Sequence, residues 1–457
     1  MIDTKFNWTA IAQQLQPLEI ITEPNQLTKL SLDYYHFSPV LTPLLENKRA
    51  DLVVRPTTER EVLQVARVCV QQKIPLTVRG AGTGNYGQCI PLEGGMVLDT
   101  TNMNRISWLK PGLASVEPGV KLAAFDKKAR KIGYELRMAP STYRTATIGG
   151  FIGGGSGGIG SVTYGQLRDR GNLHAVRVVT LEDQPRVVEL RGDQVQQINH
   201  AYGTNGIITQ LEIPLAPAYP WAELIVIFHD FLTAAKFGEV LSNSDGIMKK
   251  LVSIHAAPIP SYFTALQRYL PQGKHCALVT ISEFSLEPFH ELVKEYQGEV
   301  TYSKTAAEAS KGTSLAEFTW NHTTLHARSI DPNITYLQTL FSSLEQVEQM
   351  YRYFGDEVMM HLEFMRVEGK AIPGALQLVR YSSLERLEEI IRYHEDNGAF
   401  IANPHTYILE DGGRKTIDKE QLGFKQMVDP YGLMNPGKMR GWWESYPPKS
   451  PLSKGDF

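Results

Sequence analysis

The sequence predicts an α+β protein made of two parts with different character. Its 457 residues are enough for two large domains or about three of ordinary size. Eight of the 38 glycines fall between positions 149 and 160, which marks the first part as glycine-rich. After the prolines at 217 and 220 the pattern changes, and strands alternate with helices.

The first part is expected to combine short strands, two amphipathic helices and glycine-rich loops. A helix over 57–72 is predicted because Thr58 and Glu61 have capping-box spacing and apolar residues recur every three to four positions. A second helix begins near Leu122 and ends at Gly133, a residue type favoured just beyond helix C-termini. Strands are predicted at 74–78, from 96 onward, at 175–181, 186–190 and 211–215, and loops at 79–87 and 149–160.

The second part is predicted to be a sheet with helices packed on one side, because apolar β-type runs alternate with helical periodicity. No repeat of fixed period is present, so a solenoid is not expected. The predicted strands are 224–228, 251–256, 277–282, 334–340, 358–367 and 375–381, and the predicted helices lie near 231–242, 261–269, 288–296, 343–353 and 383–396.

The overall composition is that of an ordinary globular protein. Hydrophobic residues make up 42% and charged residues 21%, and 46 Lys and Arg against 49 Asp and Glu leave a net charge of -3. Such a balance excludes a largely disordered chain and gives no basic surface for nucleic acid, so no nucleic-acid partner is expected. The densest basic run, at 127–131, is interpreted as the solvated face of a helix.

Cysteine usage and hydropathy favour a cytoplasmic protein. Cys69, Cys89 and Cys276 are too few and too scattered for a disulfide framework, which favours a reducing compartment. The first residues lack a basic segment followed by an apolar stretch, and no window of 18 apolar residues occurs. We therefore expect an unprocessed protein with no membrane span.

The two glycine-rich loops are the strongest functional signal. G-x-G-x-x-G matches at three places, so the pattern alone has little value. A Rossmann site is rejected because a strand, not a helix, follows Gly87, and a Walker A site is rejected because no Gly-Lys-Ser/Thr follows either loop. A flexible linker at 149–160 is disfavoured by the apolar Phe151 and Ile159 within and Ile148 beside it. The loops suit a long ligand whose diphosphate and aromatic ends both need close backbone approach.

Four motifs occur in order along the chain: Arg79-Gly80-x-Gly82-Thr83 to Gly87, Ala139-Pro140 with Thr147-Ile148-Gly149-Gly150 and Tyr164-Gly165, Gly203 to Thr209, and Asp429-Pro430 to Lys438. Together they resemble the vanillyl-alcohol oxidase / p-cresol methylhydroxylase (PCMH-type) superfamily of FAD enzymes. The resemblance covers about residues 30–217 and the last 60 or so, and it implies a two-subdomain FAD-binding domain with an α+β, ferredoxin-like cap. The expected division is an FAD-binding domain at 1–217 with its core at about 46–217, a cap at 218–398, and a C-terminal segment at 399–457 that returns to the FAD domain.

The resemblance also implies which residues hold FAD. Many relatives have a histidine that bonds covalently to the flavin where this chain has Thr83, so we expect noncovalent FAD. The chain has no counterpart of the His-rich metal-binding segment of several D-2-hydroxyacid dehydrogenases, so no metal is expected and the lactate or glycolate assignment is weakened. The implied residues are Arg79, Gly80, Ala81, Gly82, Thr83, Gly84, Asn85, Tyr86 and Gly87 at the pyrophosphate, Pro140, Thr147, Gly150, Gly157 and Ser161 along the isoalloxazine and ribityl side, Ile207 near the adenine, and Asn435 in the returning tail.

The proton acceptor is sought in the cap and the tail. His405 and Tyr407 project the same way if their segment is extended, and they are the first candidates, although a structural histidine with a packed tyrosine explains them equally well. His322 lies among polar residues without helical periodicity and is predicted to lie in a loop. His322 and His326 have the i, i+4 spacing of a metal-binding pair on a helix, but no third ligand is evident, so a structural role is favoured for His326. Further candidates are Glu363, on one face of a strand with His361, and Arg366 and Arg380 as partners of a substrate carboxylate or of surface acids.

Together these features predict an FAD-dependent oxidoreductase that oxidises a small alcohol or hydroxy acid by hydride transfer to flavin N5. Two alternatives stay open: a nonenzymatic flavin-binding subunit of an electron-transfer complex, and a reductase that takes electrons from a nicotinamide donor. The partner is a small-molecule substrate. The electron acceptor, whether oxygen, quinone or cytochrome, is left open, as are the substrate and the oligomeric state.

Overall fold

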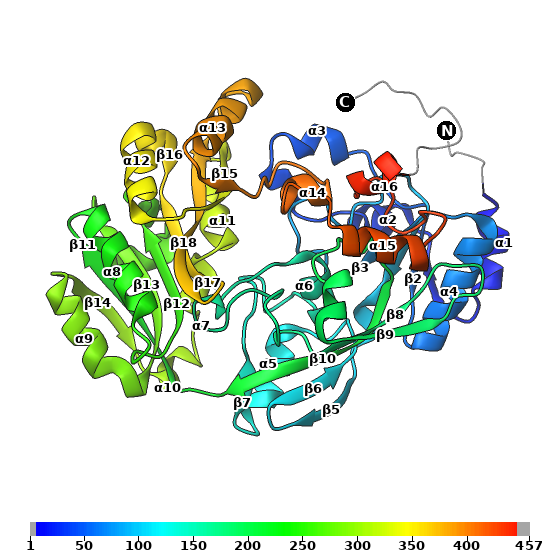
Figure 1. Cartoon of the computed structure of the whole chain (residues 1–457), viewed down its shortest axis with the longest axis horizontal. Helices are drawn as coiled ribbons and strands as arrows, with labels where there is room; N and C mark the ends of the chain where they lie inside the picture. The colour runs from blue at the N-terminus through cyan, green and yellow to red at the C-terminus, as the bar shows by residue number, and fades with distance from the viewer. Residues whose placement is uncertain (1–5, 446–457) are drawn as a thin grey trace.

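The computed structural model describes residues 6–445 and confirms the α+β fold. Its strands form three sheets: two small sheets lie together on one side of the molecule, and a large sheet with its helices lies on the other (Figure 1). Within residues 6–445, no helix is long and apolar enough to cross a membrane.

The first small sheet has the strand order β1-β2-β4-β3, with β2, β4 and β3 parallel. The predicted helix α4 connects β2 to β3, and the Thr58 side chain accepts the Glu61 N–H at 3.3 Å, as its spacing predicted. The Glu61 carboxylate accepts the N–H of Thr57 instead of that of Thr58, so the reciprocal bond is shifted by one residue. The elements are α1 (Trp8–Gln14), β1 (Glu19–Ile21), α2 (Pro24–Leu30), α3 (Leu41–Leu45), β2 (Leu52–Arg55), α4 (Glu59–Gln72), β3 (Leu76–Arg79) and β4 (Met96–Asp99).

The second small sheet is antiparallel, with the order β5-β6-β10-β8-β9 and β7 paired to β10. One hydrophobic cluster joins it to the first sheet, because Val179 and Ile207 pack with Leu52 and Met96. Gly133 follows the predicted second helix with a φ of 80°. The elements are β5 (Ile106–Lys110), β6 (Leu113–Val116), α5 (Leu122–Arg130), β7 (Tyr134–Leu136), α6 (Ile148–Gly154), α7 (Ser161–Tyr164), β8 (Ala175–Val179), β9 (Val187–Arg191) and β10 (Ile207–Pro217).

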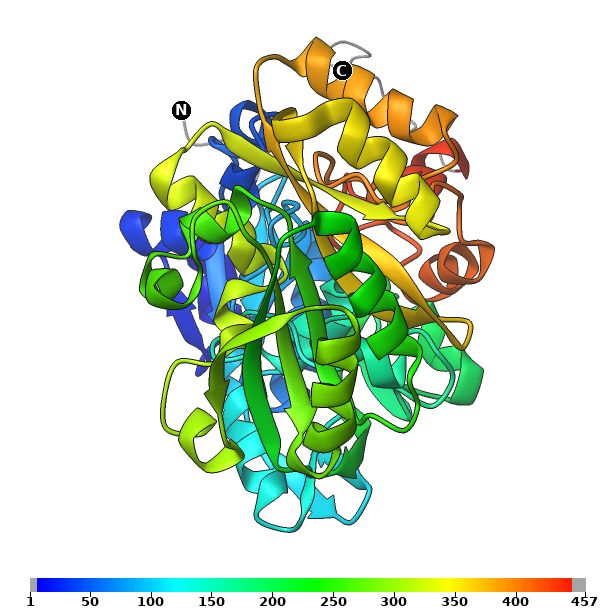
Figure 2. The same ribbon diagram turned by 90° about the vertical axis from the view of Figure 1, so that its left-hand side faces the viewer.

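The large sheet has nine strands, and the helices at 231–243, 286–295, 344–354 and 384–396 cover its outer face (Figure 2). The main hydrophobic core fills the space between them, with Phe228, Phe237 and Phe289 among its largest side chains. The opposite face carries α11 and turns toward the small sheets. The elements are β11 (Trp221–Phe228), α8 (Phe231–Asn243), β12 (Lys249–His255), β13 (His275–Ser282), α9 (Leu286–Glu295), β14 (Glu299–Lys304), α10 (Ala306–Ala309), α11 (Asn321–Ile330), β15 (Ile334–Leu340), α12 (Leu344–Phe354), β16 (Val358–Met359), β17 (His361–Val367), β18 (Lys370–Arg380), α13 (Leu384–Asp396) and β19 (Phe400–Ile401).

The C-terminal segment packs against the small sheets beside α6 (Figure 1). The Leu76 N–H donates to the Leu433 carbonyl and the Asn435 N–H donates to the Leu76 carbonyl, both at 2.8 Å. Tail and β3 are therefore held side by side. The helices of this segment are α14 (Leu409–Gly412), α15 (Lys419–Val428) and α16 (Arg440–Ser445).

The predicted loop at 149–160 and the predicted helix near 261–269 were wrong, and the strand predicted at 358–367 is present but interrupted. The 149–160 loop begins as helix α6, because Thr147 caps the Gly150 N–H at 3.3 Å and close packing favours glycine in this helix: a Cβ on Gly149 would lie 2.4 Å from Pro118. The helix near 261–269 is two 3-10 turns, Ile259–Tyr262 and Thr264–Tyr269, separated by Phe263 with a nonhelical ψ of 67°. The strand 358–367 is interrupted at Met360.

Candidate cofactor and active site

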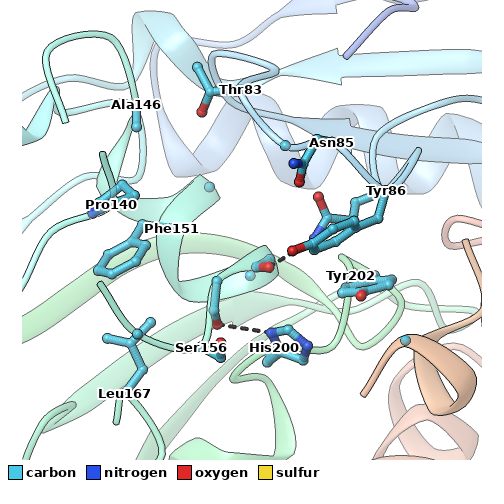
Figure 3. Close-up of a pocket in the computed structure, with 18 of the residues that line it drawn as sticks. Thr83, Asn85, Tyr86, Pro140, Ala146, Phe151, Ser156, Leu167, His200 and Tyr202 are labelled. Carbon is cyan, nitrogen blue, oxygen red and sulfur yellow. Dashed lines mark hydrogen bonds between the residues drawn. The ribbon is translucent and has the colours of Figure 1, made fainter. Parts of the chain in front are cut away.

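A cavity of about 660 Å³ lies where the glycine-rich segments, the C-terminal segment and the inner face of the large sheet meet. This volume is within the usual range for small-molecule sites. Figure 3 shows part of it, with Thr83, Asn85 and Tyr86 on one side and Phe151 and His200 on the other.

The 79–87 loop forms one wall, and its glycines are required by close contacts. Gly82 has a φ of 65°, and a Cβ on it would lie 2.3 Å from the Arg79 guanidinium. A Cβ on Gly80 would lie 2.2 Å from the hydroxyl of Thr147, the residue that caps α6, so a side chain at position 80 would collide with this cap. The Arg79 guanidinium donates to the Leu32 carbonyl at 2.7 Å and so ties the start of the loop to the segment that follows α2.

Two side chains that the sequence analysis missed connect the cavity walls. Gln88 donates to the Gly154 carbonyl at 2.8 Å, and Nδ1 of His200 lies 2.9 Å from the Gly155 carbonyl (Figure 3). A carbonyl only accepts, so Nδ1 of His200 carries the hydrogen. Burial lowers the pKa of His200 to about 4. Both residues are polar and follow no apolar periodicity, so no sequence signal marked them.

Most of the residues predicted to hold FAD line this cavity: residues 79–86, Pro140, Thr147, Gly150 and Gly157. Gly87, Ser161, Ile207 and Asn435 are not among the lining residues. They lie behind the wall: the hydroxyl of Ser161 accepts the Gly158 N–H at 2.9 Å, and the amide of Asn435 donates to the carbonyls of Gln88 at 2.7 Å and Tyr202 at 2.6 Å.

A buried pair of opposite charges lies beneath the 79–87 loop. Lys438, fully buried, donates to the Gly87 carbonyl, and the Asp33 carboxylate accepts the Tyr35 N–H at 2.9 Å. Burial is the largest influence on both: it raises the pKa of Asp33 to about 7 against the attraction of Lys438, and lowers the pKa of Lys438 to about 7 against that of Asp33. Lys438 was part of a recognised motif, whereas nothing in the sequence indicated Asp33.

The cap side of the cavity carries an acid and a histidine in contact. Nδ1 of His322 lies 3.2 Å from Oε2 of Glu317, and Nε of Arg144 lies 2.8 Å from Oε1 of the same carboxylate. All three residues line the cavity. Burial opposes ionisation of Glu317, but the bond and charge of His322 and the charge of Arg144 outweigh it, so the pKa of Glu317 is lowered.

The predicted loop around His322 is the first turn of helix α11. The prediction was wrong because the buried face of α11 consists of Thr323, Thr324 and Ala327, which give no apolar periodicity. Glu317 was missed because it lies in the preceding turn, Leu315–Phe318, five residues from its partner.

The other predicted catalytic and substrate-binding residues lie away from the cavity wall. His405 has both ring nitrogens occupied, at 2.8 Å from Ser38 Oγ and 2.9 Å from the Tyr336 carbonyl, and burial lowers its pKa to about 4. It lies in a turn and not in an extended segment, and neither it nor Tyr407 lines the cavity. The Tyr407 ring packs against Lys438 instead.

Glu363 lies one layer behind the cavity wall, with 1% of its surface exposed. The guanidinium of Arg366 pairs with Asp245 at 2.7 Å and that of Arg380 with Asp331 at 3.4 Å, so both serve ion pairs elsewhere. Nε2 of His326 lies 3.0 Å from the Glu317 carbonyl. No group of three or more potential ligands for a metal ion occurs among residues 6–445.

Comparisons with known proteins agree with this geometry. A family model described as an FAD binding domain matches residues 50–189. The chain is 32% identical to a D-lactate dehydrogenase of Anaerostipes hadrus over 37% of each chain, and 27% identical to the glycolate oxidase subunit GlcD of Escherichia coli (strain K12) over 42% of this chain and 40% of that one. These matches span less than half of the length of either relative.

The fold has close counterparts among solved structures. That of alkyldihydroxyacetonephosphate synthase superimposes with a TM-score of 0.74 over 96% of this chain and 86% of that one, at 14% identity, a likeness of fold alone. The glycine cradle, the long cavity and the match at 50–189 fit a dinucleotide with a diphosphate. The chain therefore contains an FAD-binding domain at residues 50–189, it is similar to FAD-linked oxidoreductases, and FAD is its cofactor.

Proposed function

We propose that the protein is an FAD-dependent oxidoreductase that oxidises the CH–OH group of a small alcohol or hydroxy acid, with His322 as the acceptor of the hydroxyl proton. One observation carries this proposal: the contact of 3.2 Å between His322 Nδ1 and Glu317 Oε2 at the cap side of the cavity. FAD supplies the hydride acceptor, N5 of its ring. The chain must then supply a base for the hydroxyl proton and groups that orient the alcohol.

The Glu317–His322 pair has the geometry of such a base. A carboxylate beside Nδ1 holds that nitrogen in its protonated form, which leaves the Nε2 lone pair as the proton acceptor. The lowered pKa of Glu317 keeps this carboxylate ionised at neutral pH. Once Nε2 takes the proton, the negative charge of Glu317 stabilises the resulting imidazolium.

The cofactor is proposed to lie along the 79–87 loop and α6 without a covalent bond, since Thr83 occupies the place of the attaching histidine. Backbone N–H groups of residues 80–86 would contact the diphosphate, and the residues between Pro140 and Gly157 would contact the flavin side. The proposed division is an FAD domain at 1–217, a cap at 218–398 that supplies the base, and the tail at 399–457. A cytoplasmic location belongs to the proposal, supported by three free cysteines.

The test is anaerobic flavin reduction in the purified holoenzyme, followed by loss of the blue absorbance band. A panel of hydroxy acids, sugars and alditols is compared with a nicotinamide donor. Reduction by the nicotinamide donor alone would favour the reductase alternative, and reduction only by a partner protein would favour the electron-transfer subunit.

The role of His322 is tested in the same assay with His322→Gln. We expect the reduction rate to fall by about 10²- to 10⁴-fold, the range for loss of a positioned base. His290→Gln, an exposed histidine in α9, is the matched control and should keep the wild-type rate. A wild-type rate in His322→Gln would show that another group takes the proton.

A further inference from the structure

The segment 314–322, which carries Glu317 and His322, is fixed at both ends by buried carboxylates of the large sheet. Glu223 projects from β11 and is 5% exposed, and Glu363 projects from β17 and is 1% exposed. Neither lines the cavity. A buried carboxylate is costly unless donors satisfy it, so the partners of these two residues are informative.

Glu223 holds the start of the segment. Its Oε2 accepts the backbone N–H of Leu315 at 3.1 Å, and its Oε1 accepts the hydroxyl of Ser314. The turn that these bonds begin, Leu315–Phe318, contains Glu317.

Glu363 holds the end of the segment. Its Oε1 accepts the backbone N–H of Trp320 at 2.6 Å and the hydroxyl of Ser253 at 2.8 Å, and lies 2.9 Å from Nε2 of His361. Nδ1 of His361 is 3.1 Å from the Leu376 carbonyl, so it donates there.

Trp320 needs this support because of its backbone conformation. Its φ of 52° lies in the left-handed region, which bulky residues rarely adopt, and no side chain caps the helix that begins at the next residue. Such outliers persist where the surroundings hold them, and they concentrate at functional sites. The 2.6 Å bond to Glu363 therefore sets the direction in which α11 starts, and His322 lies in that first turn.

We propose that Glu223 and Glu363 are positioning residues that hold Glu317 and His322 in the relative position required for proton transfer. The inference rests on the proposed role of His322. It adds that the pair owes its geometry to two carboxylates outside the cavity, acting through backbone N–H groups.

The first test removes the Glu363 carboxylate, which accepts the backbone N–H of Trp320. Glu363→Ala should lower the rate of flavin reduction at saturating substrate by about 100-fold, the loss expected for a misplacement near 1 Å, and change KM by less than about twofold. Glu363→Gln keeps an oxygen for the Trp320 N–H and should recover most of the rate. The matched control is Glu135→Gln, a fully buried carboxylate of β7 that accepts the Trp221 ring N–H, pairs with Arg130 and Lys250 and lies away from the cavity. The reduction rate of the FAD-loaded, folded control should be unchanged.

A second measurement does not depend on activity. In the wild-type apoprotein, amide hydrogen exchange should be slow at Leu315 and Trp320, and in Glu363→Ala it should speed up at Trp320 alone. Fast exchange at Trp320 in the wild type would overturn the proposal even if the alanine variant did not fold.

A double-mutant cycle separates this proposal from the proposed function. If Glu363 acts through His322, Glu363→Ala should have little further effect in the His322→Gln background. An equal loss in both backgrounds would refute the positioning role and leave His322 as the base. A wild-type rate in His322→Gln alone would refute the base assignment itself.

Discussion

Replacing Gly80 by alanine tests whether the close approach of the 79–87 loop and α6 builds the cofactor site. The added Cβ would lie 2.2 Å from the Thr147 hydroxyl but 3.5 Å or more from its other neighbours, whereas ordinary contact begins near 3.4 Å. The hydroxyl must therefore rotate away and give up its bond to the Gly150 N–H, or the loop and α6 must move apart. The φ of Gly80 is not in the left-handed region, so the cost is steric and not conformational. Overpacking of this kind costs about 1–3 kcal/mol.

We expect that cost to appear in FAD binding. The apoprotein can relax the loop outward, but the bound state requires loop and α6 together around the diphosphate. At 1.4 kcal/mol per tenfold change, the Kd for FAD should rise by about 5- to 150-fold. The assay is titration of apoprotein with FAD, followed by quenching of flavin fluorescence.

The cycle with Thr147→Ala identifies the clash. Removing the hydroxyl should recover part of the affinity in Gly80→Ala, although Thr147→Ala alone loses the α6 cap, at about 1 kcal/mol. Gly423→Ala in α15, where a Cβ meets nothing within 4 Å, is the matched control and should bind FAD normally with up to about 1 kcal/mol more stability. An unchanged Kd in Gly80→Ala would refute the reasoning.

Three further predictions follow from the buried groups and the loop. Lys438→Met should destabilise the fold by about 1–3 kcal/mol in denaturant unfolding, because the Gly87 carbonyl loses its buried donor and Asp33 loses the attraction that opposes its raised pKa; Asp33→Asn in the same background should restore part of the loss, and no recovery would contradict the electrostatic coupling. His200 and His405 are neutral in the fold with pKa values of about 4, so the unfolded chain binds more protons between roughly pH 6.5 and 4. The free energy of unfolding should therefore fall as the pH drops through that window, and these two groups should not change it at higher pH. His405→Gln should reduce the slope of the free energy of unfolding against pH. An unchanged slope would show that His405 does not contribute. Acid precipitation should leave FAD in the supernatant, whereas yellow colour in the pellet would show a covalent bond at a residue other than Thr83.

Local sequence signals predicted much of the fold correctly. The α4 boundary followed from Thr58, whose side chain caps the helix as its spacing indicated. The strand 334–340 followed from its apolar run and has the predicted bounds. These signals work because a cap or a buried face is set within a few residues of the chain.

The sequence analysis was wrong where distant contacts overrode the local pattern. Glycine favours loops, yet residues 148–154 form α6, which Thr147 caps and in which contact with Pro118 leaves room only for glycine at position 149. His405 looked like a base, but Ser38 and Tyr336, 367 and 69 residues away, occupy both ring nitrogens. His322 was a candidate, but its partner Glu317 and the carboxylate of Glu363 that holds Trp320 were recognisable only in three dimensions.

By itself, the sequence determined the α+β class, the FAD-binding domain and the two glycine-rich segments, because each depends on residue types at short, fixed spacings. Only the tertiary structure decided which polar side chains face the cavity and which lie buried behind it. That choice depends on partners contributed by other strands and loops, and short-range periodicity contains no information about them. The buried carboxylates of Glu223 and Glu363 show the difference, since their role is visible only in the N–H groups that they accept.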